Sequence, residues 1–150
     1  MPVQPLSLRG RALAALARRE HSNAELERKL APHAESMEQL AQVLQQLQAE
    51  GWLSNERFVQ SLVRRRAPKL GVARIKLELL QHHLTPEQTR TELEHLKQTE
   101  YERALALWRR KYEQPAQTDQ ERARQARFLA GRGFAAEVIR RLLYRAGNDD

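Results

Sequence analysis

The chain has 150 residues, enough for one or two domains, but only two Trp, three Tyr and three Phe against 30% charged residues, which favours an elongated fold with several small helix-on-helix cores. The absence of cysteine excludes disulfides and thiol chemistry, and it is compatible with a reducing cytoplasm, where we expect the protein to act. No apolar run approaches the ~18 residues of a membrane span, and no signal-peptide pattern opens the chain, so we expect neither membrane insertion nor export.

The net charge of +7 is unevenly distributed along the chain. Residues 1–53 and 85–117 each carry six basic and six acidic side chains, whereas residues 54–84 contribute +5 and residues 118–150 contribute +2. Such asymmetry favours a polyanionic or acidic partner that faces two regions of the surface. For any single arginine, exposure on a solvated helix face is the simpler explanation, because surface charge is the usual fate of this residue.

Helix-start signals recur along the whole chain. Five segments match the capping box, in which Ser or Thr is followed three residues later by Glu or Gln, and they begin at Ser22, Ser36, Thr85, Thr99 and Thr118. Each is followed by apolar residues at helical spacing, and no segment shows the alternation typical of a strand. The sequence therefore predicts an all-α protein of about nine helices. Their predicted starts lie near Ser7, Ser22, Ser36, Ser54, Gly71, Thr85, Thr99, Thr118 and Phe134.

The predicted helices group in threes. The leading helix of each group starts at residue 7, 54 or 99, and the intervals of 47 and 45 residues are in the range of helical repeat arrays. We therefore expect an elongated tandem array of three three-helix repeats, over residues 1–53, 54–98 and 99–150. A unit of this size has a small core, so neighbouring units are expected to stabilise one another.

The second predicted repeat holds the densest basic cluster. Its first helix has an apolar stripe from Phe58 to Val63, and its arginines should face solvent because they are too costly to bury unpaired. Pro68 ends this helix and leaves residues 68–71 as a short joint, because proline lacks a backbone donor and disfavours helical geometry in the residue before it. The basic residues around this joint are Arg57, Arg64, Arg65, Arg66, Lys69, Arg74 and Lys76.

The third predicted repeat contains aromatic residues and a second basic region. Tyr101, Trp108 and Tyr112 could form a stacking platform for single-stranded bases, but their i, i+7, i+11 spacing places them on one helix face, which favours core packing. Trp52 is expected to anchor the first repeat to the second. The turn at residues 131–134 contains two glycines and either shapes a contact surface or joins two helices. The basic residues around it are Arg127, Arg132, Arg140, Arg141 and Arg145.

No residue pattern points to catalysis, a metal or a cofactor. The chain has no phosphate-binding glycine loop, and its six glycines are scattered. Adjacent His82 and His83 would diverge by about 100° on a helix and have no further ligands at metal-binding spacing, so we expect them at a surface or an interface. Capping explains Ser22 without a nucleophilic role. We therefore expect a protein that is not an enzyme.

The chain resembles the RecX family of recombination regulators over nearly all of its length, and three segments carry the resemblance. HSNAELERKL, residues 21–30, is similar to the first-repeat motif of that family. GWLSNERFVQSLVRRR and LGVARIKLEL are similar to its second repeat, and RFLAGRGFAAEVI to the FLxxRGF signature of its third. Two places depart from the family pattern: Lys69 replaces the first glycine of a Gly-x-Gly, and His82-His83-Leu84 replaces Lys-Gly-Ile.

The resemblance implies a right-handed, curved array that binds RecA, lodges in the groove of the RecA–DNA filament, and reduces strand exchange and ATP hydrolysis. Weak binding to single- or double-stranded DNA is also implied. The alternatives are a helical nucleic-acid-binding module that acts independently of RecA, and a generic helical adaptor. We expect a monomer without membrane association. The predicted RecA- or DNA-binding residues are Arg57, Arg64, Arg65, Arg66, Lys69, Arg74, Lys76, Arg127, Arg132, Arg140 and Arg141.

Overall fold

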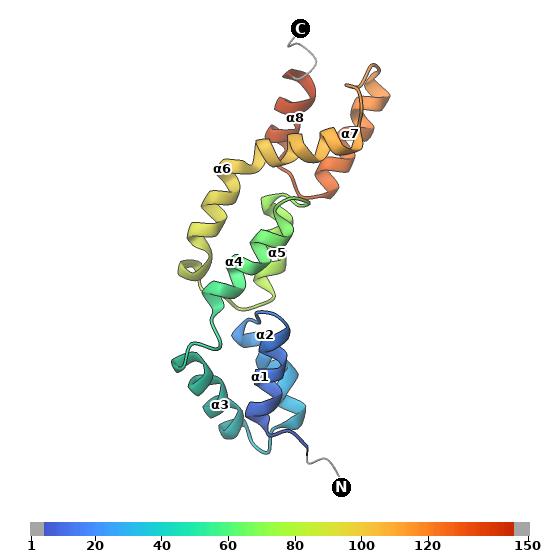
Figure 1. The fold of residues 1–150 in the computed structure, drawn as a ribbon. Coiled ribbons are helices and arrows are strands. Elements are labelled where there is room, and N and C mark those ends of the chain that lie inside the picture. The colour runs from blue at the N-terminus through green and yellow to red at the C-terminus, as the bar shows by residue number, and fades with distance from the viewer. Residues whose placement is uncertain (1–4, 146–150) are drawn as a thin grey trace.

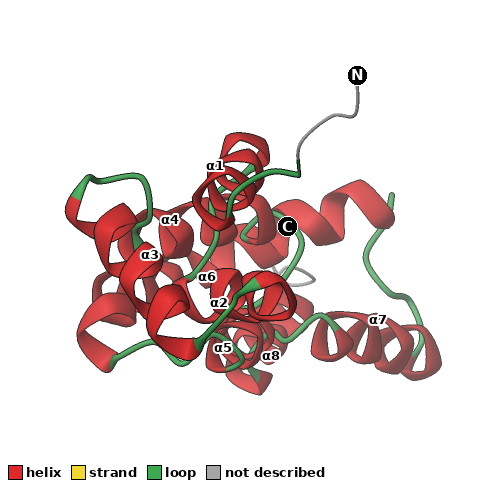
Figure 2. Cartoon of the chain, turned by 90° about the horizontal axis from the view of Figure 1, so that it is seen from below, coloured by secondary structure: helices red, strands yellow, loops and turns green. Residues whose placement is uncertain are grey.

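The structure is a computed structural model that describes residues 5–145, and within this range it contains helices and loops but no strand (Figure 2). The all-α prediction is therefore confirmed. The helices follow one another in an elongated, curved array, with α1 near one end and α8 at the other (Figure 1). The elements are α1 (Leu8–Arg18), α2 (Asn23–Leu30), the 3₁₀ helix η1 (Ala31–His33), α3 (Met37–Ala49), α4 (Asn55–Arg66), α5 (Val72–Leu80), α6 (Pro86–Lys111), α7 (Asp119–Gly131) and α8 (Ala136–Arg145).

Side-chain caps determine where most of these helices begin. A hydroxyl oxygen before the helix accepts a hydrogen bond from the backbone N–H three residues later, and so satisfies a donor that the helix cannot pair. At Thr85 the box is reciprocal, because the Gln88 side chain also accepts from the Thr85 N–H. Such a cap typically contributes about 1 kcal/mol. The capping residues are Ser7, Ser22, Ser36, Ser54, Thr85 and Thr118.

The predicted helix start at Thr99 is wrong, and the described residues form eight α-helices rather than about nine. Residues 86–111 form one continuous helix of 26 residues, α6, in which Thr99 is an interior position. Its hydroxyl donates to the backbone oxygens of His95 at 3.2 Å and Leu96 at 3.3 Å, one turn back along the same helix. A Ser/Thr-x-x-Glu match caps a helix only where the chain leaves helical geometry, and no proline or glycine follows Pro86 before the helix ends.

Three clusters of buried apolar side chains follow one another along the array. The first contains side chains from α1, α2 and α3, the second from α4, α5 and the first half of α6, and the third from the second half of α6 with α7 and α8. Leu96 packs into the second cluster and Trp108 into the third, so α6 joins these two clusters as one continuous helix. None of the helices in the described range is long and apolar enough to cross a membrane.

The prediction that Trp52 anchors two repeats is also wrong, because its side chain is 56% exposed. Gly51 has a φ of 85°, and the Trp52 N–H bonds to the oxygen of Leu47 at 2.9 Å, which is the pattern of a Schellman helix end. This turn directs Trp52 to solvent. The next residue, Leu53, is 2% exposed and enters the first cluster instead.

Candidate partner-binding surface

Two of the predicted contact residues, Arg57 and Arg66, hold the protein together. Arg66 donates from Nε and Nη2 to the two carboxylate oxygens of Glu78, both at 3.0 Å, and so joins α4 to α5. This paired hydrogen bond raises the pKa of Arg66. Arg57 donates to Glu20 at 2.9 Å and to the backbone oxygen of Gly51 at 2.7 Å. Both arginines therefore present a partly neutralised charge to any partner.

Arg74 lies where the two predicted basic regions meet. Its Nη1 donates to the backbone oxygen of Gly131 at 2.8 Å, and the N–H of Gly71 donates to the backbone oxygen of Arg132 at 2.8 Å. A Cβ atom on Gly71 would lie 2.3 Å from the backbone oxygen of Gly133. The 68–71 joint and the 131–134 turn thus touch backbone to backbone, and Gly133 permits this close contact within the chain.

Arg103 and Arg110, which the sequence analysis did not select, hold the same joint from α6. Arg103 Nη1 donates to the backbone oxygens of Ala67 at 2.9 Å and Leu70 at 2.7 Å, and burial lowers its pKa. Arg110 Nη2 donates to the backbone oxygen of Pro68 at 3.0 Å. Carbonyl groups released at a helix end need donors, and these two guanidinium groups supply them.

Glu100 completes this support and was also missed. Its side chain is only 6% exposed, and Oε1 accepts from the Val72 N–H at 2.9 Å, at the N-terminus of α5, where the helix dipole favours a negative charge. Gly71, the residue before α5, has no side chain to cap this helix. The absence of a capping side chain at a predicted helix start was the signal, but it could not name a partner 28 positions away in the chain.

Around the 68–71 joint, four predicted contact residues are exposed and form neither an ion pair nor a side-chain hydrogen bond to another element of the described structure: Arg64, Arg65, Lys69 and Lys76. Arg64 lines a groove of about 740 Å³ between α4 and α6. Arg65 reaches only the backbone oxygen of Ser61, at 3.4 Å, one turn back in its own helix. Because their charges are not neutralised within the protein, these four cations are available to a partner.

In the third cluster, two predicted contact arginines cover aromatic rings. The guanidinium carbon of Arg141 lies 4.0 Å from the centre of the Tyr101 ring, and that of Arg132 lies 5.2 Å from the centre of the Phe128 ring. Trp108 is 7% exposed and donates from Nε1 to Gln125 Oε1 at 2.9 Å. Core packing is therefore confirmed for Trp108, and Tyr101, Trp108 and Tyr112 do not form an open platform.

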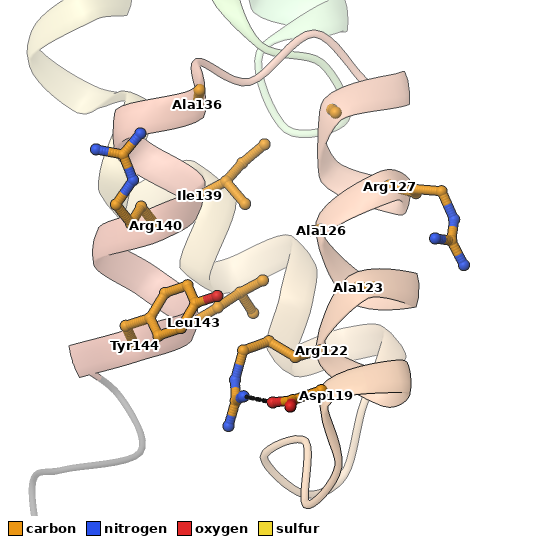
Figure 3. Close-up of a pocket in the computed structure, with 11 residues that line it drawn as sticks. Asp119, Arg122, Ala123, Ala126, Arg127, Ala136, Ile139, Arg140, Leu143 and Tyr144 are labelled. Atoms are coloured by element: carbon orange, nitrogen blue, oxygen red, sulfur yellow. Dashed lines mark hydrogen bonds and ion pairs between the residues drawn. The ribbon is translucent and has the colours of Figure 1, made fainter.

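Arg127 and Arg140 flank a groove of about 410 Å³ between α7 and α8. Figure 3 shows Ile139 pointing into this groove, whereas Arg127 and Arg140 extend away from it on opposite sides. Arg122, inside the groove, donates to Asp119 at 2.9 Å. Arg127 and Arg140 thus do not point toward one common position. The side chain of Arg145 lies outside the described part of the structure.

The contact between the first and second clusters is polar. His82 Nδ1 and Ser22 Oγ are 2.6 Å apart, and the His82 ring lies with its centre 4.4 Å from that of Phe58. Burial lowers the pKa of His82. The prediction of an interface histidine is confirmed for this residue, and Ser22 also caps α2 as expected. Within residues 5–145 no group of three or more potential ligands could hold a metal ion.

Comparison with known proteins identifies the family. The regulatory protein RecX of Leptothrix cholodnii is 51% identical to this chain over 144 residues, which cover 96% of this chain and 92% of that protein. The chain belongs to the RecX family. The regulatory protein RecX of Ralstonia pickettii is 47% identical over 150 residues, covering 100% of this chain and 93% of that protein. The family model of the third three-helix domain of RecX matches residues 98–143.

Solved structures of RecX proteins share the fold. The crystal structure of RecX from Lactobacillus salivarius superposes with a TM-score of 0.78 and 16% identity, over 94% of this chain and 95% of that one. A second crystal structure of a RecX protein gives a TM-score of 0.67 and 17% identity, over 97% and 82% of the two chains. The helical RecX array predicted from three short motifs is thus confirmed, and the protein is a RecX-family regulatory protein.

Proposed function

We propose that this protein binds the RecA recombinase on its DNA filament and reduces strand exchange and ATP hydrolysis, without catalysing a reaction itself. Membership of the RecX family supports a regulatory role. The observation that carries the proposed contact is the group of exposed cations without ion-pair partners among the described residues, Arg64, Arg65 and Lys69, around the end of α4. A filament of protein and DNA offers many acidic groups to such a surface.

The proposed mechanism is steric and electrostatic. An elongated, curved array can contact more than one subunit of a helical filament (Figure 1). If it binds the inactive arrangement of these subunits more tightly than the active one, it shifts the filament toward the inactive state. The size of this effect is limited by the difference between the affinities for the two filament states. Arg66 and Arg74, whose guanidinium groups bond within the chain, would act mainly by keeping the surface in shape.

The test is a double charge reversal, Arg64→Glu with Arg65→Glu, in an assay of DNA-dependent ATP hydrolysis by RecA. We expect the concentration needed for half inhibition to rise about tenfold or more, because attraction is replaced by repulsion. Arg18→Glu with Arg109→Glu is the matched control, since both residues are exposed and lie in segments without net charge. Equal inhibition by wild type and the Arg64/Arg65 variant would refute the assignment, and no inhibition by wild type would refute the function.

A nucleic-acid-binding module that acts without RecA is the second candidate, because the same cations would serve it. Direct phosphate binding predicts that the affinity for single-stranded DNA alone falls with salt, with a log–log slope of about −0.7 per phosphate contact. The RecA-directed mechanism predicts weak binding to DNA alone and strong binding to preformed filaments. Measuring both affinities over a series of salt concentrations separates the two candidates.

A further inference from the structure

A second surface, on a different face of α6, has a chemistry that the α4 arginines do not share. It is a groove of about 540 Å³ between the end of α5 and the start of α6. The α6 residues that line it run from Pro86 to Lys97, a rise of about 16 Å, which is the length of roughly three helical turns. The groove that contains Arg64 is lined by other α6 residues, such as His95 and Thr99.

The floor of the α5–α6 groove is apolar and partly exposed to solvent. Its apolar lining residues are Leu79, Leu80, Leu84, Pro86 and Leu93. Leu79 is buried in the second cluster, whereas Leu80 is 64% exposed and so presents an apolar side chain at the surface. A row of leucines of this kind accepts the apolar stripe of a helix, with side chains at i, i+3, i+4 and i+7. The floor contains no Phe, Tyr or Trp ring on which a nucleic acid base could stack.

The rim of the groove is positively charged. Lys76, Arg90 and Lys97 are exposed, line the groove and form no ion pair with any described residue, whereas Glu94 is the single acidic residue of the lining. An occupant with acidic residues on both sides of its apolar stripe would therefore match the groove in both shape and charge. A basic or neutral helix would match only the floor.

His83, at the end of the groove, provides an independent observation. It has a φ of 51°, the only positive φ of a residue other than glycine among the described residues. A residue other than glycine is strained in this left-handed geometry, because its Cβ approaches the neighbouring backbone too closely. The backbone does not need histidine here, and the side chain is exposed and lines the groove. Strain of this kind accompanies binding sites.

We propose that the α5–α6 groove binds a short amphipathic helical segment of a partner protein, with leucine-like anchors on one face and acidic residues beside them. The leucine floor takes the anchors, and Lys76, Arg90 and Lys97 bind the carboxylates. This proposal is independent of the recombinase contact proposed above, because that contact uses Arg64, Arg65 and Lys69 around the end of α4, and none of these lines the α5–α6 groove; Lys76, a predicted RecA- or DNA-binding residue, is assigned here to the groove.

The probe is a synthetic peptide of about 18 residues, long enough to form a helix, with leucines at i, i+3, i+4 and i+7 and glutamates on the flanks. Its binding to the full-length protein is measured by fluorescence anisotropy, against the same peptide with lysines in place of the glutamates. We expect the acidic peptide to bind at least about tenfold more tightly than the basic one. Equal binding of the two peptides, or no binding of the acidic one, would overturn the proposal.

Two variants locate the binding to the groove. Leu80→Ser removes an exposed apolar contact for the peptide. It should lower the affinity for the acidic peptide by about fivefold or more, while the fold is retained. Leu77→Ser is the matched control, because Leu77 is 60% exposed on the same helix but does not line the groove. If both variants lower the affinity for the acidic peptide equally, the peptide does not occupy the groove as proposed. The same conclusion follows if single-stranded DNA at equal concentration displaces the peptide completely.

The charge variant separates this proposal from the recombinase contact. Arg90→Glu with Lys97→Glu should lower the affinity for the acidic peptide at least about tenfold and raise the affinity for the basic peptide. Arg64→Glu with Arg65→Glu should leave both peptides unchanged. If the Arg64/Arg65 variant no longer binds the peptide, the peptide site is not the α5–α6 groove. If that variant binds the peptide normally but no longer inhibits RecA, the result supports two separate surfaces.

Discussion

Replacing Gly71 by alanine should separate the second cluster from the third. Gly71 has a φ of −81°, which any residue adopts, so the substitution acts through steric overlap alone. The new Cβ would lie 2.3 Å from the Gly133 oxygen, 2.4 Å from the Gly133 carbonyl carbon and 2.5 Å from the Phe134 nitrogen. Ordinary contact begins near 3.4 Å, so the two backbones must move apart by about 1 Å.

That movement costs the two hydrogen bonds across the contact, Gly71 N–H to Arg132 and Arg74 to Gly131, both of 2.8 Å. Each contributes about 0.5–1.5 kcal/mol, and overpacking costs about 1–3 kcal/mol where it is not relieved. The two costs do not add in full, because a movement that breaks the hydrogen bonds also relieves the steric overlap. We therefore expect the free energy of unfolding to fall by about 2–4 kcal/mol. For a chain of this length the melting temperature should fall by roughly 10 °C.

Thermal and urea unfolding followed by circular dichroism at 222 nm measure this loss. Gly131→Ala is the matched control, because a Cβ there meets nothing within 4 Å and the backbone oxygen that accepts from Arg74 remains. Gly131 lies at the end of α7, so alanine should leave stability unchanged or raise it by up to about 1 kcal/mol. If Gly71→Ala is as stable as wild type, or if Gly131→Ala destabilises as much, the close contact does not hold the two clusters together.

Three further predictions concern single side chains. His83→Gly should raise the free energy of unfolding by about 1 kcal/mol, because glycine adopts the φ of 51° without strain; a loss of stability in urea titration would show that the imidazole has stabilising contacts. Arg103→Met keeps much of the side-chain volume but leaves the carbonyls of Ala67, Leu70 and Leu96 without their donor, so unfolding free energy should fall by about 2–4 kcal/mol, whereas Arg109→Met should be near neutral; equal effects would contradict the role of Arg103. Burial lowers the pKa of His82 below the value of about 6.5 in an unfolded chain, so the unfolded state binds more protons and stability should fall as the pH drops below about 6.5. A smaller fall in His82→Asn than in wild type, measured between about pH 7.5 and 5.5, checks this, and an identical fall would assign the effect to other groups.

The recognition of the family and of the helical class depended on local information. Ser22, Ser36, Thr85 and Thr118 are followed within three residues by the groups that begin a helix, so their capping role can be predicted from adjacent positions alone. The same rule failed at Thr99 because a capping motif describes what a residue can do at a helix end, and it does not create the end. Whether the chain leaves helical geometry there depends on packing against α4 and α8.

The site was less predictable than the fold. The composition of residues 54–84 showed a basic surface, but it could not divide Arg66, which pairs with Glu78, from Arg65, which pairs with no described acidic residue. The two arginines are adjacent on α4 but face different directions. Only Arg66 faces α5, where Glu78 is within reach of an ion pair. Arg103 and Glu100 were missed for the same reason.

Sequence alone determined the helical class, most helix starts, the basic character of the second repeat and membership of the RecX family, because each of these depends on residues close together in the chain. Only the tertiary structure decided that α6 is a single continuous helix, that Gly71 and Gly133 pack backbone to backbone, and which cations have no ion-pair partner among the described residues. These depend on groups about 30 to 60 positions apart, such as Glu100 with Val72 and Arg74 with Gly131. Their pairing is set by the geometry of the folded array, and no local pattern encodes it.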